Sequence, residues 1–441
     1  MPKSVSLSSG ICYQWKMTGQ DQEITDAIGI LGAGQLSQML IQSAGKIGAR
    51  LRIYAASENE PAAREAKRDG GRADVSIGTL SDPASLGTLR NFLSAQSICG
   101  FESELVDCDV LRTAATGLAV RFVPQLEIME RLSQKLEQKR LLSSLGIPSA
   151  RFCEGPADEA GLDSWFEDLR NRFGPSFIVK WSKFGYDGRG VLAVTDETGG
   201  DASLKAAKAS CKLALARGTR PYAEERVAFV RELAIVGCHS TNGELATYPL
   251  VISEQEHGIC RRVRGPAVSL GVNPRFETLA VQYAEKIAKA LPLHGSFGLE
   301  LFETRDGDLW VNEIAPRVHN SGHYTQDACE TDQFANHLHA ISGRMLGDTG
   351  TRAEVCFFAM LNLLAPQGFQ GKAEPPPLLQ PGAAPQEIFP HWYDKDEAFP
   401  GRKLGHFNCV ARNREDLTSR IALMENCARD WENALLRRKR R

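Results

Sequence analysis

The hydrophobic pattern at the start of the chain predicts a strand, a helix and a second strand. Apolar residues dominate positions 27–31, as is typical of a buried strand. A glycine-rich turn follows. Amphipathic spacing then predicts a helix that ends near Ile47, before another β-prone run at 48–54. This order of elements is a βαβ unit, which places a parallel sheet in the N-terminal part of the chain.

The turn of this unit carries Gly32 and Gly34, two of the three glycines of the dinucleotide-binding fingerprint, while Ser37 stands at the third position. Backbone amides at such a helix start can bind an anion, but they do not say which anion. A nicotinamide-dependent dehydrogenase is therefore one alternative. It would need an acidic ribose ligand about 20 residues beyond the turn, where the chain offers only Glu58.

A second pattern is an Asp306-Gly307 pair between two alternating, β-prone runs, which predicts a hairpin. Folding about this pair in one continuous register places Glu300 opposite Glu313. Like charges directly opposite each other destabilise a sheet. A divalent cation between them would reverse that effect, because Mg²⁺ takes carboxylate oxygens and keeps substrate phosphates as its other ligands. The alternative is a pair of half-exposed glutamates neutralised by a lysine.

A third pattern consists of two apolar runs, 177–180 and 191–194, that flank a loop with three glycines and a basic residue. Such a loop between paired strands suits a flap over phosphates, and an ordinary mobile hairpin is the alternative. Lys180 ends the first run and is expected to point into a cleft. A helix pattern over 134–145 stops at Gly146 and Pro148, so we place the first domain boundary near 125–135.

Composition narrows the class of protein. The 441 residues suffice for two or three domains, and 42% hydrophobic with 24% charged residues is ordinary for a soluble globular protein. A formal net charge of -2 gives no reason to expect binding to nucleic acid or to an anionic membrane. We find neither a signal peptide nor a run of about 18 apolar residues. The 11 scattered cysteines contain no Cys-x-x-Cys pair, which predicts buried thiols in a reducing, cytoplasmic compartment.

The C-terminal part is less regular. Residues 365–388 are rich in proline and glycine, which predicts an irregular connection. The final residues, 435–441, end an amphipathic helix with a cationic cluster. We interpret this cluster as solvated charge that complements the helix dipole, in preference to a nucleic-acid contact.

An ordered set of short motifs carries a family resemblance. The chain resembles the N5-carboxyaminoimidazole ribonucleotide synthetase family of ATP-grasp enzymes, from about residue 27 to 412. The motifs are Gly-x-Gly-Gln-Leu at 32–36, Gln-Lys at 138–139, Val-Lys at 179–180 before Gly-Tyr-Asp-Gly-Arg-Gly, Tyr-Pro at 248–249, the block from Asn312 to His323, and Gly-Arg-Lys-Leu-Gly-His at 401–406.

The resemblance implies an α/β and α+β architecture with an ATP-grasp fold. Residues 27–130 would form a Rossmann-like, pre-ATP-grasp domain. Residues 131–364 would form the ATP-grasp domain, with a flexible nucleotide flap at about 181–228. A small C-terminal β-rich segment would cover 365–412, and residues 1–26 and 413–441 would be extensions. Members of this family are commonly homodimers.

The resemblance also implies a ligase of purine biosynthesis. Bicarbonate would attack the γ-phosphorus of ATP to give carboxyphosphate and ADP. The amine of 5-aminoimidazole ribonucleotide would then capture the carboxyl group and release phosphate. Because phosphoryl transfer depends on alignment and charge neutralisation, a metal ion is expected with ATP: Mg²⁺, with Mn²⁺ as an alternative.

For the metal and ATP, the resemblance assigns residues one by one. Glu300 and Glu313 would hold the metal, and Lys139 would support ATP binding by its charge alone. A strand at 223–227 would contact adenine through its backbone, and Glu224 or Glu232 would take the ribose hydroxyls. The expected ATP-binding residues are Lys135, Lys180, Gly185, Gly188, Glu224, Glu225, Glu232 and Asn312.

The other assignments concern the acceptor end. Arg317 would grip carboxyphosphate with its planar fork, aided by neutral donors. The expected catalytic residues are Arg317, His319, Asn320, Tyr186 and Asp187. The expected substrate-binding residues are Gln35, Ser321, Tyr393, Lys395, Arg402 and Lys403.

Several positions differ from the family pattern, and they concern the acceptor more than ATP. A ligase that joins the activated carboxyl group to a different amine is therefore an alternative, as is a nucleotide-binding regulatory subunit without turnover. The Asp394 carboxylate would stand beside the expected phosphate site, and Lys135 would replace an arginine. The differing positions are Ser37, Gln38, Lys135, Phe184, Ser253, Gln255 and Asp394.

Overall fold

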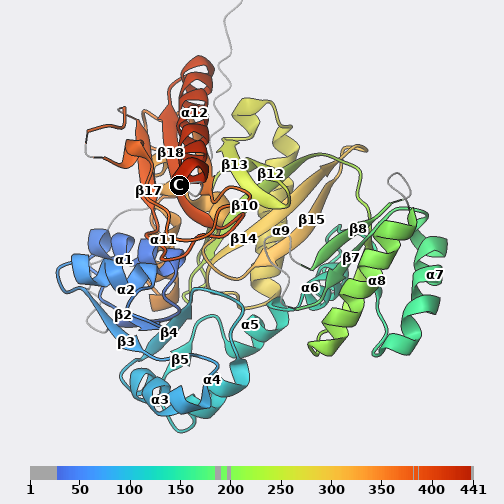
Figure 1. Ribbon diagram of the computed structural model, residues 1–441. Helices are drawn as coiled ribbons and strands as arrows, with labels where there is room; N and C mark the ends of the chain where they lie inside the picture. The colour runs from blue at the N-terminus through green and yellow to red at the C-terminus, as the bar shows by residue number, and fades with distance from the viewer. Residues whose placement is uncertain (1–26, 184–189, 196–199, 381, 386, 439–441) are drawn as a thin grey trace, which may run out of the picture.

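The computed structural model describes residues 27–183, 190–195, 200–380, 382–385 and 387–438. Four expected site residues, Gly185, Tyr186, Asp187 and Gly188, lie outside the described residues, as do Phe184 and the extension 1–26. The described chain contains three sheets (Figure 1). The N-terminal sheet lies at the lower left of the view, the smaller sheet lies at the right, and the large sheet lies between them and reaches into the C-terminal region. The predicted mixture of α/β and α+β architecture is confirmed.

The N-terminal sheet has five parallel strands in the order β3-β2-β1-β4-β5, so the predicted βαβ opening is confirmed. One face of this sheet is covered partly by α11 (Gln333–Ser342), from much later in the chain, because Phe334 and Leu338 share a core with β1 and β2. The elements are β1 (Ile28–Leu31), α1 (Gln35–Ile47), β2 (Leu51–Ala55), α2 (Pro61–Arg68), β3 (Ala73–Ile77), η1 (Pro83–Ser85), α3 (Leu86–Ser94), β4 (Ile98–Phe101), α4 (Cys108–Ala115), β5 (Arg121–Phe122) and α5 (Leu126–Leu132).

The glycine-rich turn before α1 binds a carboxylate side chain of the same protein, that of Glu102. The Glu102 carboxylate accepts hydrogen bonds from the backbone amides of Gly34 at 2.5 Å and Leu36 at 3.0 Å. A Cβ at position 34 would lie 2.4 Å from Glu102 Oε1, and one at Gly32 would lie 2.8 Å from Oε2. A bound dinucleotide would place its pyrophosphate at this helix start. Since Glu102 fills that place, the geometry argues against the dehydrogenase alternative.

Substituting Gly34 with alanine is expected to destabilise the protein by about 1–3 kcal/mol, because the added methyl group must displace the half-buried Glu102 carboxylate from its backbone hydrogen bonds. Gly87 near the start of α3 is a matched control, since a Cβ there meets nothing within 4 Å. Gly87→Ala should leave stability unchanged or raise it by up to about 1 kcal/mol. Urea unfolding of both variants checks this. An unchanged midpoint for Gly34→Ala would show that Glu102 moves aside freely.

The smaller sheet has four strands in the order β6-β9-β7-β8, and the predicted pair of strands around Lys180 is confirmed. Helices α7 and α8 pack on one face, against Phe177 and Val179 of β7. Because side chains alternate along a strand, Ile178 and Lys180 face the opposite side. The elements are α6 (Lys135–Ser144), β6 (Phe152–Glu154), η2 (Glu159–Gly161), α7 (Leu162–Phe173), β7 (Phe177–Trp181), β8 (Val191–Val194), α8 (Gly200–Ala216) and β9 (Pro221–Glu225).

The large sheet has nine strands, with β15-β14-β10-β12-β13-β16-β18-β17 in order and β11 paired to β10. Strands β17 and β18 of the expected C-terminal segment thus extend the central sheet. Its elements are β10 (Phe229–His239), β11 (Leu245–Thr247), β12 (Val251–Glu256), β13 (Ile259–Gly265), η3 (Val268–Leu270), α9 (Pro274–Ala290), β14 (Gly295–Thr304), β15 (Leu309–Ala315), η4 (Asn320–Gly322), α10 (Thr325–Ala328), α11 (Gln333–Ser342), β16 (Phe357–Leu364), η5 (Pro377–Leu379), β17 (Ile388–Trp392) and β18 (Lys403–Ala411).

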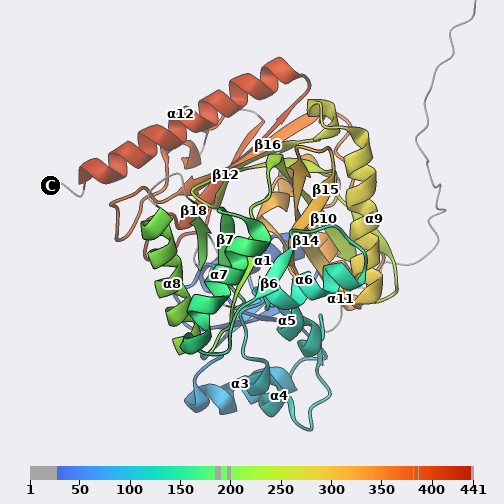
Figure 2. The same ribbon diagram turned by 90° about the vertical axis from the view of Figure 1, so that its right-hand side faces the viewer.

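The final helix, α12 (Arg414–Arg438), makes up most of the expected C-terminal extension. It lies along the outside of the C-terminal strands (Figure 2). Leu417, Met424 and Trp431 are buried in a core shared with β16 and β18, at the spacing of one helix face. Among the described residues, no helix is long and apolar enough to cross a membrane.

The hairpin of β14 and β15 pairs Glu300 with Glu313, as predicted. The predicted continuous register is wrong nearer the turn, where Leu301 pairs with Val311. The turn holds three residues, because the amide of Thr304 donates to the carbonyl of Asp308 at 2.9 Å. A β-bulge at position 312 absorbs the extra residue. Bulges re-aim side chains next to functional sites, and this one brings Asn312 and Glu313 to the same cleft.

Candidate active site

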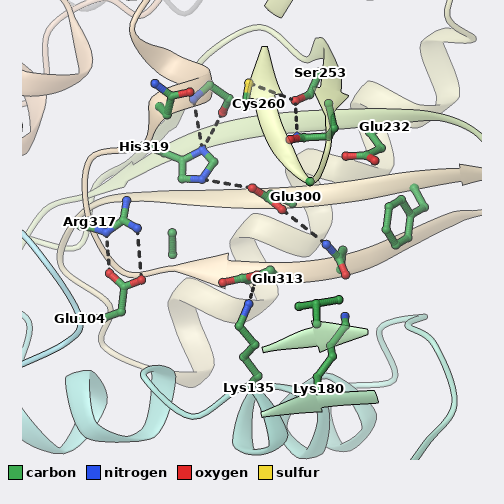
Figure 3. Close-up of a pocket in the computed structure, with 18 of the residues that line it drawn as sticks. Glu104, Lys135, Lys180, Glu232, Ser253, Cys260, Glu300, Glu313, Arg317 and His319 are labelled. Carbon is green, nitrogen blue, oxygen red and sulfur yellow. Dashed lines mark hydrogen bonds and ion pairs between the residues drawn. The ribbon is translucent and has the colours of Figure 1, made fainter. Parts of the chain in front are cut away.

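A cleft of about 700 Å³ opens between the smaller sheet and the large sheet (Figure 3). The N-terminal domain contributes the start of α1 and the segment after β4 to its wall. This volume lies in the range of small-molecule sites. Residues from Gln35 to Lys403 contribute to it, so the fold gathers a wall from nearly the whole described chain. The expected site residues that line the cleft are Gln35, Lys135, Lys180, Glu224, Glu225, Glu232, Glu300, Asn312, Glu313, Arg317, His319, Asn320, Ser321 and Lys403.

The paired carboxylates lie at the centre of this cleft, each beside a basic side chain. Lys135 Nζ is 2.5 Å from Glu313 Oε2, and His319 Nε2 is 3.6 Å from Glu300 Oε1. Burial opposes ionisation of Glu300, but His319 and Lys135 keep its pKa below the usual value. The alternative to a metal site was a pair of glutamates neutralised by a lysine, and Lys135 is such a lysine.

The donor set also fits a hard divalent cation. Two carboxylates face each other across adjacent strands, and Asn312 Nδ2 lies 3.4 Å from Glu300 Oε2. Among the described residues, no group of three His, Cys, Asp or Glu side chains could hold a metal. A cation here would have one or two carboxylate ligands and would complete its shell with phosphate oxygens and water, as Mg²⁺ does at nucleotide sites.

Lys180 and Glu224 form a second charged group, on the face of the smaller sheet that turns toward the cleft. Lys180 Nζ is 2.8 Å from Glu224 Oε2, and Lys139 Nζ is 3.3 Å from Glu224 Oε1. The Tyr222 hydroxyl donates to the same carboxylate at 3.0 Å. Burial alone would raise the pKa of Glu224, but the two lysines lower it to about 2. The carboxylate is therefore ionised at neutral pH, and it is held by two lysines and one tyrosine hydroxyl.

Arg317 begins the loop at the acceptor end and is held by a residue from the N-terminal sheet. Its Nε and Nη2 atoms contact the two Glu104 carboxylate oxygens at 2.5 and 3.2 Å. Burial works against the Glu104 charge, but Arg317 outweighs it and lowers the carboxyl pKa. The planar pair fixes the orientation of the guanidinium. It also ties the loop after β15 to the N-terminal sheet.

The next residues of this loop are held by hydrogen bonds. His319 Nδ1 is 2.8 Å from Ser321 Oγ. Asn320 exchanges two side-chain hydrogen bonds with Asn362 of β16, at 3.1 and 2.7 Å. These contacts orient neutral and basic donors toward the cleft beside Glu300 (Figure 3).

Three expected substrate-binding residues are not among the residues that line the cleft. Tyr393 is buried, with its hydroxyl 2.8 Å from His406 Nδ1. Lys395 Nζ donates to the carbonyl of Lys403 at 2.7 Å, and the Arg402 guanidinium stacks over Phe399 at 5.1 Å. Of the expected cationic cluster, only Lys403 reaches the cleft wall.

The positions that differ from the family pattern have local partners. Asp394 does not stand alone beside an anion site, because Arg68 contacts it at 2.8 Å and Arg64 at 3.4 Å. Buried Ser37 donates to the carbonyl of Gly32 at 2.7 Å. Buried Gln38 donates to the carbonyl of Trp392 at 3.2 Å. Ser253 and Gln255 line the cleft.

Sequence reasoning missed several residues of the cleft wall, among them the polar side chains Glu102, Glu104 and Cys260. A signal for the first two existed. They follow the buried strand β4, which neighbours β1, and ligand sites of parallel sheets lie at the carboxyl ends of such strands. Cys260 carries no comparable signal. Its pKa is raised to about 11 by burial, so it is a neutral thiol at pH 7.

Comparison with known proteins gives consistent matches along the chain. Family models match for a ribonucleotide synthetase preATP-grasp domain at 25–130, an ATP-grasp domain at 140–334, and a phosphoribosylaminoimidazole carboxylase C-terminal domain at 359–420. The N5-carboxyaminoimidazole ribonucleotide synthase of Synechococcus elongatus is 35% identical, covering 86% of this chain and 88% of that protein. The Mycobacterium leprae synthase is 34% identical, covering 87% and 84%.

Solved structures of proteins from the same family are also similar to this chain. The Thermus thermophilus N5-carboxyaminoimidazole ribonucleotide synthetase has a TM-score of 0.73 and 30% identity, covering 90% of this chain and 96% of that one. The Aspergillus clavatus synthase, solved with ADP and 5-aminoimidazole ribonucleotide, has a TM-score of 0.76 and 27% identity, covering 92% and 99%. Both matches extend over the N-terminal, central and C-terminal parts of the chain.

Proposed function

The chain belongs to the N5-carboxyaminoimidazole ribonucleotide synthase family of ATP-grasp ligases, and we propose from this premise how its cleft works. It is a ligase of purine biosynthesis that uses ATP and bicarbonate to carboxylate 5-aminoimidazole ribonucleotide. The reaction proceeds through carboxyphosphate. The assignment of residues rests on one observation: a single cleft holds two facing carboxylates, the lysines Lys135 and Lys180, and an arginine fixed by Glu104.

Glu300 and Glu313 are the proposed ligands of Mg²⁺ or Mn²⁺. The metal would neutralise charge on the β- and γ-phosphates of ATP. Lys135 contacts Glu313, and its ammonium group would pair with a phosphate oxygen if a metal ion neutralised that carboxylate. Asn312 lies beside Glu300 and supplies a neutral donor.

Lys180 is the proposed partner of the ATP phosphates, because it lines the cleft from the smaller sheet. Apolar Ile178 and Val191 of the same sheet line the cleft near it and suit the faces of adenine. The backbone after Glu225 would bind the adenine edge, and Glu232 of β10 would take the ribose hydroxyls.

The acceptor end lies around the loop after β15. Arg317 would bind carboxyphosphate through its fork, while His319 and Asn320 donate to the developing charge. Gln35 of α1 and Lys403 of β18 reach the cleft from opposite domains and would hold 5-aminoimidazole ribonucleotide. With water excluded, carboxyphosphate would persist until the amine attacks its carboxyl carbon.

The test is a coupled assay of ADP release. With ATP, Mg²⁺ and bicarbonate, ADP should form steadily only when 5-aminoimidazole ribonucleotide is added, and ¹³C-bicarbonate should label the product. If the rate of ADP release did not change with millimolar 5-aminoimidazole ribonucleotide but rose with another amine, the protein would be the alternative ligase, which acts on a different amine. We also propose a homodimer, which light scattering after size exclusion would measure.

A further inference from the structure

Lys139 is a buried cation for which the proposed binding of ATP leaves no direct role. It lies on α6 one turn after Lys135, and its side chain is only 2% exposed. It is not among the residues that line the cleft, so its ammonium cannot touch a bound phosphate there. A buried charge is costly unless it is paired. The charge of Lys139 is therefore stabilised by its ion-pair partner Glu224, whose Oε1 lies 3.3 Å from Lys139 Nζ.

The Glu224 carboxylate is shared unequally. Its Oε2 contacts Lys180 at 2.8 Å, while its Oε1 is 3.3 Å from Lys139 and accepts from the Tyr222 hydroxyl at 3.0 Å. Two ammonium groups thus share one negative charge. Lys180 is 13% exposed and lines the cleft, whereas Lys139 is enclosed. Of the two, Lys180 is the lysine that lies at the cleft wall and can turn toward a ligand.

We infer that Lys139 is a positioning residue that remains on Glu224 as its counter-ion when ATP binds and so releases Lys180 to the phosphates of ATP. The inference rests on the proposed ATP site. If Lys139 were absent, Lys180 would be the one lysine left within ion-pair distance of Glu224 among the described residues. Its departure would then leave a buried carboxylate without a contacting cation. Lys180 would then stay on Glu224, and ATP would lose a contact.

The ionisation of Lys139 agrees with this role. Burial, together with repulsion from Lys180, lowers its pKa to about 8, against the attraction of Glu224 and Glu313. The Tyr222 hydroxyl stays neutral, because burial raises its pKa well above the usual value. Lys139 is therefore charged at pH 7 and loses that charge as pH rises through about 8. The KM for ATP should rise over the same range.

The test compares Lys139→Met with the wild-type protein. The KM for ATP should rise roughly tenfold to a hundredfold, the loss expected for one charge-assisted hydrogen bond. The kcat at saturating ATP should fall less than about threefold, and the alkaline rise in KM should disappear. The melting temperature should be unchanged or higher, because Lys180 still neutralises Glu224 and one buried charge is gone. A purely structural lysine would instead lower the melting temperature.

A double variant separates this mechanism from local damage. If Glu224 traps Lys180, then in a Glu224→Gln background Lys139→Met should change the KM for ATP less than about threefold. Lys289→Met on the exposed face of α9 is the matched control and should have no effect. Lys139→Gln replaces Lys139→Met if the latter does not fold. A KM within twofold of wild type, or an undiminished penalty in the Glu224→Gln background, would overturn the inference. Wild-type protein that releases no ADP would instead refute the proposed function.

Discussion

Glu313→Gln is expected to lower ADP formation about a thousandfold or more, because it removes one of two carboxylates proposed to hold the metal on the transferring phosphate. Glutamine keeps the shape of the side chain, so the cleft should retain its packing. The fold should survive, since Lys135 also lies near Glu300 and Glu224. The measurement is the rate of ADP release at saturating ATP, followed by titration with Mg²⁺ or Mn²⁺.

Glu303→Gln is the matched control for this variant. Glu303 lies on the same strand as Glu300, but it pairs with Arg231 at 2.8 Å and is not among the cleft-lining residues. Its substitution should change the rate less than about threefold. If Glu313→Gln kept more than a tenth of wild-type activity, the two glutamates would be only a lysine-neutralised pair, the alternative that the sequence leaves open.

Arg317→Lys is expected to lower formation of the carboxylated product roughly a hundredfold to a thousandfold, the range seen when one preorganised donor to a developing charge is lost. Lysine keeps the positive charge but loses the planar fork that Glu104 now holds at two points. Carboxyphosphate should then be held less well and escape to water. The ratio of ADP released to product formed, which should be one in the wild type, should rise.

The control for this prediction is Arg275→Lys on the exposed first turn of α9, which should leave both rate and ratio unchanged. Glu104→Gln adds a second check. It leaves Arg317 in place but removes the carboxylate that orients it, so it should raise the ratio by a smaller factor than Arg317→Lys. Equal ADP and product in Arg317→Lys would show that the guanidinium does not hold the carboxyl intermediate.

Short-range sequence patterns predicted much of the fold and the carboxylate pair at the centre of the site. The βαβ opening and the strands around Lys180 follow from apolar periodicity. Glu300 and Glu313 face each other because a turn only a few residues away brings them together. The bulge at Asn312 was not predictable in the same way, since the turn takes three residues where Asp-Gly suggests two.

Contacts between distant segments required the tertiary structure. Glu104 and Arg317 are 213 positions apart, and no periodicity links them. The contacts of the Glu102 carboxylate with the start of α1, and of Asp394 with the arginines of α2, also join segments that are distant in the sequence. Each of these contacts depends on how two separately formed parts of the fold pack against each other.

The sequence by itself determined the family, the order of elements and the facing carboxylates, because these depend on side-chain periodicity, ordered motifs and one short turn. Only the tertiary structure decided which charge neutralises which. Lys139 and Lys180 share Glu224, Lys135 contacts Glu313, and Glu104 holds Arg317. The physical reason is that pairing a buried charge depends on distances between layers, and residue spacing along the chain does not set those distances.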